Sequence, residues 1–152
     1  MSKPNILYLH SHDTGRYISP FGQAVPTPHL QQLAEEGMLF RQAFCANPTC
    51  SPSRACLVTG QWAHCNGMLG LAHRGFRLND YSHHLVSVLR KKGYFSALSG
   101  VQHVARGSAA DPAEIGYDQI LESGGDKDRQ DAITDAAVEF LNQEREDPFF
   151  LA

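Results

Sequence analysis

Features that direct a chain to a membrane or to nucleic acid are missing from these 152 residues. No apolar run approaches the roughly 20 residues that a membrane-spanning helix needs. The N-terminal segment has one Lys, a short apolar stretch and no small-residue cleavage site, so no signal peptide is visible. The longest basic run is Arg90-Lys91-Lys92, without an aromatic stacking pattern beside it. We therefore expect a cytoplasmic protein that binds neither a membrane nor nucleic acid, and the sequence indicates no oligomeric state.

The cysteines lack the paired C-x-x-C spacing of a structural zinc site. They are Cys45, Cys50, Cys56 and Cys65. A chain with 42% hydrophobic residues does not need disulfides to build a core. We interpret Cys45, Cys56 and Cys65 as buried thiols, the common state of a free cysteine. The residues that follow Cys50 suggest another role for it.

Charge is divided unevenly along the chain. Residues 1–110 hold ten Lys or Arg against four Asp or Glu, a balance of +6, together with all eight histidines. Residues 111–152 hold three against twelve, a balance of -9. The basic, His-rich part suits a small anionic substrate, whereas we interpret the acidic part as a solvated helix face.

Strand and helix patterns alternate along the chain. Apolar, β-prone segments predict strands, and amphipathic segments that end at Gly predict helices. The predicted strands are 5–10, 94–100 and 148–152, with a short strand or extended piece at 38–44. The predicted helices are 28–37, 52–60, 82–93 and 128–144, while 101–107 and 108–127 are expected to be loops. This alternation favours an α/β fold with a mostly parallel sheet covered by helices.

The predicted strand 148–152 is apolar and the sequence stops inside it. An unpaired hydrophobic strand at a domain end invites aggregation. We therefore expect residues 1–152 to be one domain that is truncated within a strand.

Cys50 stands just before a predicted helix, and Arg54 follows one turn further on. A helix N-terminus holds anions through its free N–H groups and its dipole, and a guanidinium can bind the same anion. The polar residues after strand 5–10 come where ligands bind in open α/β sheets. The pattern predicts an anion site with a reactive side chain at its mouth. The alternative is that Cys50 is a buried, inert thiol.

The run Cys50 to Gly60 (CSPSRACLVTG) resembles the C-x-P-x-R…T-G signature of the sulfatase family. Further segments resemble parts of the family in the same order, namely 5–15, 26–30, 37–44, 93–103 and 148–151. The resemblance therefore covers essentially the whole chain. It implies the N-terminal portion of an alkaline-phosphatase-like α/β fold. Within the family, residues 64–71 (HCNGMLGL) look most like the sulfamidase, or heparan N-sulfatase, branch.

The resemblance also implies residue roles. In the family, a formylglycine-generating enzyme oxidises the motif cysteine to formylglycine, whose hydrate attacks the sulfur. Cys50 would be this precursor and a metal ligand, Arg54 would stabilise the modified residue, and His103 would hydrogen-bond the nucleophile. Asp13 would be an acidic ligand of a divalent metal. Ca²⁺ is the first choice of metal, with Mg²⁺ or a transition metal as alternatives.

Two positions depart from the family pattern. His12 stands where the family usually has its first metal-binding Asp, and imidazole is a poor Ca²⁺ ligand. Either the site tolerates nitrogen, the metal differs, or His12 is not a ligand; His10 and His12 also alternate along the predicted strand, so both cannot be ligands without a bend. Val101 replaces a Lys that contacts the sulfate, and Arg106 or His64 could supply a substitute cation.

The remaining histidines have plainer interpretations. His64 and His73 belong to a Gly-rich stretch, where substrate contact is as plausible as a surface role. His83 and His84 open a predicted helix and are interpreted as surface or cap residues.

The sequence therefore predicts a sulfuric ester or sulfamate hydrolase that uses formylglycine from Cys50 and a divalent metal. Its substrate would be a small anion, either a sulfated sugar or an aryl sulfate. The first alternative is a phosphonate or phosphate monoester hydrolase of the same superfamily. The second is a catalytically incomplete fragment that acts only as an anion-binding or interaction module.

Overall fold

The computed structural model describes residues 3–105, 112–121 and 130–152. The chain divides into two compact units, and each is described by itself. The first unit comprises Met1–Tyr8 and Ala46–Ala152, and the second comprises Leu9–Cys45. Within the described residues, no helix is both long and apolar enough to cross a membrane.

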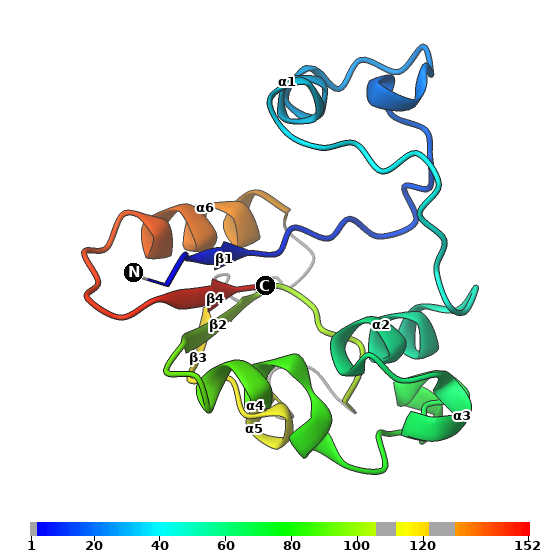
Figure 1. Cartoon of the computed structure of the whole chain (residues 1–152), viewed down its shortest axis with the longest axis vertical. Helices are drawn as coiled ribbons and strands as arrows, with labels where there is room; N and C mark the ends of the chain where they lie inside the picture. Colours follow the sequence, from blue (N-terminus) through cyan, green and yellow to red (C-terminus); the bar gives the residue numbers. More distant parts are fainter. Residues whose placement is uncertain (1–2, 106–111, 122–129) are drawn as a thin grey trace. The chain divides into compact units, whose positions relative to one another are not determined.

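A parallel sheet forms the centre of the first unit (Figure 1). Its four strands within the described residues follow the order β1-β4-β2-β3. They are β1 (Ile6–Leu7), β2 (Phe95–Ser99), β3 (Gln119–Leu121) and β4 (Phe149–Leu151). Helix α6 (Gln130–Leu141) packs against β2 and β3, and α4 (Leu85–Arg90) also packs against β2. This arrangement confirms the predicted α/β class with a mostly parallel sheet.

Strand β4 contributes to the core on both faces of the sheet. Phe150 belongs to the cluster that contains Val86 of α4, whereas Leu151 packs with Phe140 of α6. Neighbouring residues of a strand point to opposite faces, so a strand covered on both sides is apolar at every position. The segment PFFLA is apolar for this reason.

The same strand corrects the expectation of an unpaired C-terminal edge. Phe150 stands opposite Ile6 of β1 and Ser96 of β2, so β4 is hydrogen-bonded on both sides. Strand β1 is shorter than predicted: it ends at Leu7, and the Tyr8 N–H makes one more hydrogen bond to β4, to the Leu151 carbonyl at 2.8 Å. Residues 38–44 form no strand.

Three predicted helices are present. Helix α1 (Pro28–Glu36) matches the predicted 28–37, and α6 matches the described part of 128–144. Helix α2 (Cys50–Thr59) begins two residues before the predicted 52–60 and ends where Gly60 adopts a left-handed conformation, with φ 66°. Cys50 is therefore the first residue of the helix.

The prediction of one continuous helix over 82–93 is wrong. The segment forms a 3-10 turn, η3 (Tyr81–His83), and then α4, with His84 in an extended conformation between them. The His84 Nδ1 atom accepts a hydrogen bond from the Val86 N–H at 3.1 Å, which caps α4. His84 is thus a cap, as predicted, but it is buried.

The loop predicted for 108–127 is also partly wrong. It contains α5 (Pro112–Ile115) and β3, while 106–111 and 122–129 lie outside the described residues. Long-range contacts define β3: it pairs with β2, and Asp118 before it accepts hydrogen bonds from the Ser96 backbone and hydroxyl. The local pattern alone does not reveal this strand.

The second unit contains α1 and a 3-10 turn, η1 (Ser19–Phe21). The Ser19 N–H donates to Thr27 Oγ1 at 3.0 Å, which ties the turn to the start of α1. Tyr17 and Met38 are among several large apolar side chains of this unit that are exposed.

Candidate active site

The Cys50 side chain stands at the positive end of α2. Thr49 precedes the helix in an extended conformation, and the Ser53 N–H donates to the Thr49 carbonyl at 2.9 Å, which closes the first turn. The first N–H groups of an α-helix have no acceptor within the helix, and Pro52 has no N–H at all. Cys50 therefore lies beside the groups that attract an anion.

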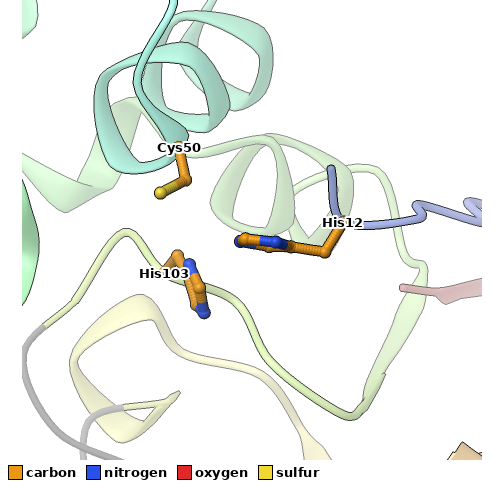
Figure 2. Close-up of side chains that lie close together, drawn as sticks. All are labelled: His12, Cys50 and His103. Atoms are coloured by element: carbon orange, nitrogen blue, oxygen red, sulfur yellow. The ribbon is translucent and has the colours of Figure 1, made fainter. Parts of the chain in front are cut away.

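His103 lies next to Cys50 (Figure 2). A ring nitrogen of His103 and the Cys50 Sγ are within 4.8 Å of one another. Both residues are half-buried and both belong to the first unit. Figure 2 also draws His12, which belongs to the second unit.

An unusual backbone holds His103 in the loop that follows β2. Its φ is 60°, in the left-handed region that non-glycine residues seldom adopt. The Gln102 side chain accepts hydrogen bonds from the Val104 and Ala105 N–H groups, and the Tyr81 hydroxyl donates to the Val104 carbonyl at 3.0 Å. These contacts offset the backbone strain, which is often retained at functional sites.

Arg54 follows Cys50 on the same helix and reaches the loop after β2. Its Nη1 donates to the Val101 carbonyl at 3.1 Å. Burial lowers the pKa of Arg54, while Tyr8, Cys50 and Tyr117 act in the opposite direction. The guanidinium remains charged all the same. The Val101 side chain is exposed and contributes no charge, so position 101 supplies a carbonyl acceptor rather than a cation.

Tyr8 and Tyr117 are parts of this region that the sequence did not indicate. Burial raises the pKa of both phenols, that of Tyr117 to about 12, although Arg54 opposes the shift. Both tyrosines are therefore neutral near pH 7, and both interact electrostatically with the Arg54 guanidinium. Tyr117 lies in the segment predicted to be a loop, and no sequence pattern connects it to Arg54.

In the second unit, Asp13 and His12 are neighbouring side chains that could each supply a metal-ligand atom. His12 Nδ1 is 3.1 Å from Asp13 Oδ2, and the Asp13 side chain is 89% exposed. Asp13 has φ 55°, and it and His103 are the non-glycine residues with positive φ among those described. Because the strand ends at Leu7, the predicted alternation of His10 and His12 along a strand does not hold.

The side chains present allow a test of whether a divalent metal fits. The exposed Asp13 carboxylate is a hard oxygen ligand and suits Ca²⁺ or Mg²⁺. The His12 imidazole and the Cys50 thiol instead suit softer transition metals. Oxidation of Cys50 to formylglycine would replace its sulfur with oxygen. Asp13 therefore fits Ca²⁺, the Cys50 position fits it after modification, and His12 does not.

His64 is not brought to the Cys50 end of α2. It is exposed on α3 (Ala63–Asn66), where Asn66 Nδ2 donates to the Thr59 hydroxyl and the Gln61 carbonyl. These contacts place α3 beside the C-terminal end of α2. Arg106, the other predicted substitute for the family's lysine, lies outside the described residues.

The prediction that the other three cysteines are buried holds for one of them. Cys56 is buried on the inner side of α2, whereas Cys45 and Cys65 are exposed. The prediction is wrong for these two, since their segments are loop or short helix at the surface.

Comparison with known proteins places these features in a family. A family model described as Sulfatase matches residues 4–152. The chain is 33% identical to N-sulphoglucosamine sulphohydrolase of Homo sapiens over 154 residues, covering 97% of this chain and 30% of that protein. It is 32% identical to an arylsulfatase of Klebsiella aerogenes over 149 residues, covering 90% of this chain and 32% of that protein. The chain spans about a third of the length of these relatives.

Solved structures support the same fold. One, described as a complex with its substrate D-glucosamine-2-N,6-O-disulfate, has a TM-score of 0.76 at 26% identity and covers 99% of this chain and 33% of that one. Another, described as a complex with k-i-k-neocarrahexaose, has a TM-score of 0.79 at 24% identity, covers 99% and 44%, and supports the fold alone. They confirm the predicted alkaline-phosphatase-like α/β fold.

Proposed function

Because the chain belongs to the sulfatase family, we propose that the protein hydrolyses sulfuric esters or sulfamates with a formylglycine made from Cys50. One observation carries the proposal. Cys50 is the first residue of α2, its Sγ lies within 4.8 Å of a His103 ring nitrogen, and Arg54 follows on the same helix. A nucleophile, a proton carrier and a fixed cation are thus brought to one end of one helix.

Each residue has a distinct role in this proposal. The hydrated aldehyde at position 50 supplies the hydroxyl that attacks sulfur, and the S–O or S–N bond to the substrate breaks, so that the alcohol or amine leaves with a proton. The second hydroxyl then loses its proton as the C–O bond to sulfate breaks, which releases sulfate and restores the aldehyde. The end of α2 and the Arg54 guanidinium stabilise the negative charge of the reacting group. His103 would hydrogen-bond the nucleophile, and its distance from Cys50 is compatible with this role because catalytic hydrogen bonds often tighten only when the substrate binds.

The proposal includes one divalent metal, with Ca²⁺ as first choice and with Asp13 and the modified Cys50 as ligands. When bound, the metal would polarise the sulfate oxygens. His12 gives the sharpest test of its identity. If His12 is a ligand, His12→Asp should tighten Ca²⁺ binding about tenfold or more, measured by calorimetry on the complete gene product. An unchanged Ca²⁺ affinity would remove His12 from the ligand set.

The substrate class is proposed to be a sulfated sugar. Two relatives favour this choice by name: N-sulphoglucosamine sulphohydrolase and the protein solved with a disulfated glucosamine. The resemblance of residues 64–71 to the sulfamidase branch favours N-linked sulfate in particular. A phosphonate or phosphate monoester would meet the same anion-binding groups, so both classes belong in the test.

The experiment is peptide mass spectrometry across Cys50 combined with turnover of para-nitrophenyl sulfate and the matching phenylphosphonate. The complete gene product is produced with a formylglycine-generating enzyme. We expect a mass about 18 Da below that of the cysteine peptide and faster turnover of the sulfate. Unmodified Cys50 in a fully active, natively produced enzyme would overturn the proposal. Faster turnover of the phosphonate would favour the phosphonate hydrolase.

A further inference from the structure

The Gly-rich stretch after α3 returns to the N-terminal end of α2. The Ser51 hydroxyl accepts a hydrogen bond from the Ala72 N–H at 3.1 Å, and both residues are buried. His73 and Arg74 follow directly in the 3-10 turn η2 (Ala72–Arg74), and both are exposed. Gly75, with φ 95°, ends the turn. Two basic side chains therefore stand on a turn that is bonded to the residue next to Cys50.

His64 and His73 consequently differ in position. His64 lies on α3, which the Asn66 amide ties to the C-terminal end of α2. His73 comes one residue after Ala72, which is tied to the N-terminal end. Ten α-helical residues span about 15 Å, so the two ends are too far apart for one small anion to touch both. The sequence alone gave both histidines the same interpretation.

The sequence segment that contains η2 carries charge of one sign. No Asp or Glu occurs between Glu36 and Asp80 in the sequence, whereas Arg54 and Arg74 both fall in that interval. Like charges that face solvent together raise the local concentration of an anionic ligand. A guanidinium binds sulfate and carboxylate oxygens in pairs, while an imidazole ring can direct one N–H at an anion.

We propose that His73 and Arg74 form an anion subsite beside the nucleophile, which binds a second negatively charged group of a sulfated sugar. This inference rests on the proposed function. The N-terminal end of α2, Arg54 and His103 bind the reacting sulfate. The turn η2 is bonded to Ser51 rather than to Cys50. Its exposed side chains, His73 and Arg74, therefore bind a substrate group that lies further from the reacting sulfate. That group is either a second sulfate or a uronate carboxylate.

The test compares substrates with one and with two charged groups. The variants are Arg74→Gln, His73→Gln and His64→Gln. Arg77→Gln is the matched control, because Arg77 is also exposed and lies only three residues after Arg74. Each is measured in the complete gene product on para-nitrophenyl sulfate, on glucosamine N,6-disulfate and on a monosulfated glucosamine linked to a uronate. The two sugars separate a sulfate from a carboxylate as the second group.

We expect Arg74→Gln to raise KM for at least one doubly charged sugar about tenfold or more, with kcat changed less than about threefold. The KM for para-nitrophenyl sulfate should rise far less, by about twofold at most. His73→Gln should show the same selectivity with a smaller factor. Arg77→Gln should leave the ratio of the KM values as in the wild type.

Three outcomes would overturn the subsite. These are an equal rise in KM for all substrates, an equal effect of Arg77→Gln, and a selective loss in His64→Gln instead of His73→Gln. Failure of the proposed function would look different, because the wild type would then turn over no sulfate ester. In that case, binding of disulfated glucosamine is compared by calorimetry between wild type and Arg74→Gln. Equal affinities would reject the subsite independently.

Discussion

The two ends of α2 carry the same residue type in different surroundings. Cys50 at the N-terminal end is half-buried beside His103, whereas Cys56, six residues later, is buried, with the Asn66 amide 4.0 Å from its sulfur. Cys50 lies beside the N-terminal N–H groups of the helix and the loop that holds His103, whereas packed side chains surround Cys56. Position on the helix, rather than residue type, separates a candidate nucleophile from a core thiol.

The C-terminal end is built from polar contacts that stay within the fold. Besides its contacts to Thr59 and Gln61, Asn66 accepts a hydrogen bond from the Met68 N–H at 2.9 Å through its side-chain oxygen. The side chain is 3% exposed, so it has little contact with water or a ligand. This end of α2 stabilises the fold, and the other end is the one proposed to bind the anion.

Two histidines differ in the same way, one at the candidate site and one in the core. His103 is half-exposed next to Cys50, while His84 is 1% exposed and caps α4. Burial lowers the pKa of His84 to about 4, so it is neutral in the folded protein near pH 7. The first is a candidate proton carrier, and the second is a structural acceptor.

Exchange of each α2 cysteine for alanine should give the largest contrast. Cys50→Ala should reduce kcat/KM for para-nitrophenyl sulfate about 10⁴-fold or more, because the nucleophile is lost. Its free energy of unfolding should change little. Cys56→Ala should instead lower that free energy by about 1 kcal/mol and keep most of the activity. Equal activity losses in the two variants would remove the distinction between the ends.

A substitution of Arg54 tests whether the planar shape of its guanidinium or only its positive charge is needed at the N-terminal end of α2. Arg54→Lys keeps the charge but loses the planar group that contacts the Val101 carbonyl. We expect kcat to fall about 100-fold with a smaller change in KM. Arg90→Lys, in the ion pair with Asp118, is the matched control and should leave kcat unaffected. An Arg54→Lys enzyme with wild-type kcat would show that charge alone suffices.

His84 should give the fold a pH dependence of its own. Its pKa is about 4 when folded, against about 6.5 for an unfolded chain. As the pH falls below about 6.5, the unfolded chain binds a proton that the folded protein excludes, so stability is lost down to about pH 4. The shift corresponds to at most about 3 kcal/mol.

Urea unfolding at about pH 7.5 and about pH 5 measures this effect. His84→Asn is the control, because an amide caps α4 without titrating in this range. The variant should be less stable than the wild type at the higher pH but should lose less stability on acidification. A loss equal to that of the wild type would assign the pH dependence to other groups.

The sequence predicted those parts of the molecule that local patterns determine. The period and boundaries of α1, α6 and β2 follow from apolar spacing and from Pro and Gly positions, and Cys50 and Arg54 follow from a motif. Strand β3 and the pairing of β4 depend on contacts between distant segments, which no local pattern contains. His64 and His73 looked equivalent because the fold, not the composition, ties their segments to opposite ends of α2.

Two asparagines, one at each end of α2, allow a comparison of the two ends in which the smallest effects are expected. Asn66 makes its contacts at the C-terminal end of α2, and at the N-terminal end Asn47 Oδ1 accepts a hydrogen bond from the Thr49 N–H at 3.0 Å. Asn66→Ala removes several buried hydrogen bonds and should cost about 2 kcal/mol of unfolding free energy. Asn47 is less buried, so Asn47→Ala should cost less than about 1 kcal/mol.

Activity should respond in the opposite order, because Thr49 directly precedes Cys50 and its N–H would lose the acceptor that holds it. We expect Asn47→Ala to lower kcat for para-nitrophenyl sulfate several-fold, about three- to tenfold, and Asn66→Ala to leave kcat near the wild-type value. Urea unfolding and steady-state kinetics on the same preparations measure both quantities. If Asn66→Ala lowered kcat more than Asn47→Ala, the two ends of α2 would not be functionally separate, and packing at the C-terminal end would have to be counted among the determinants of the Cys50 position.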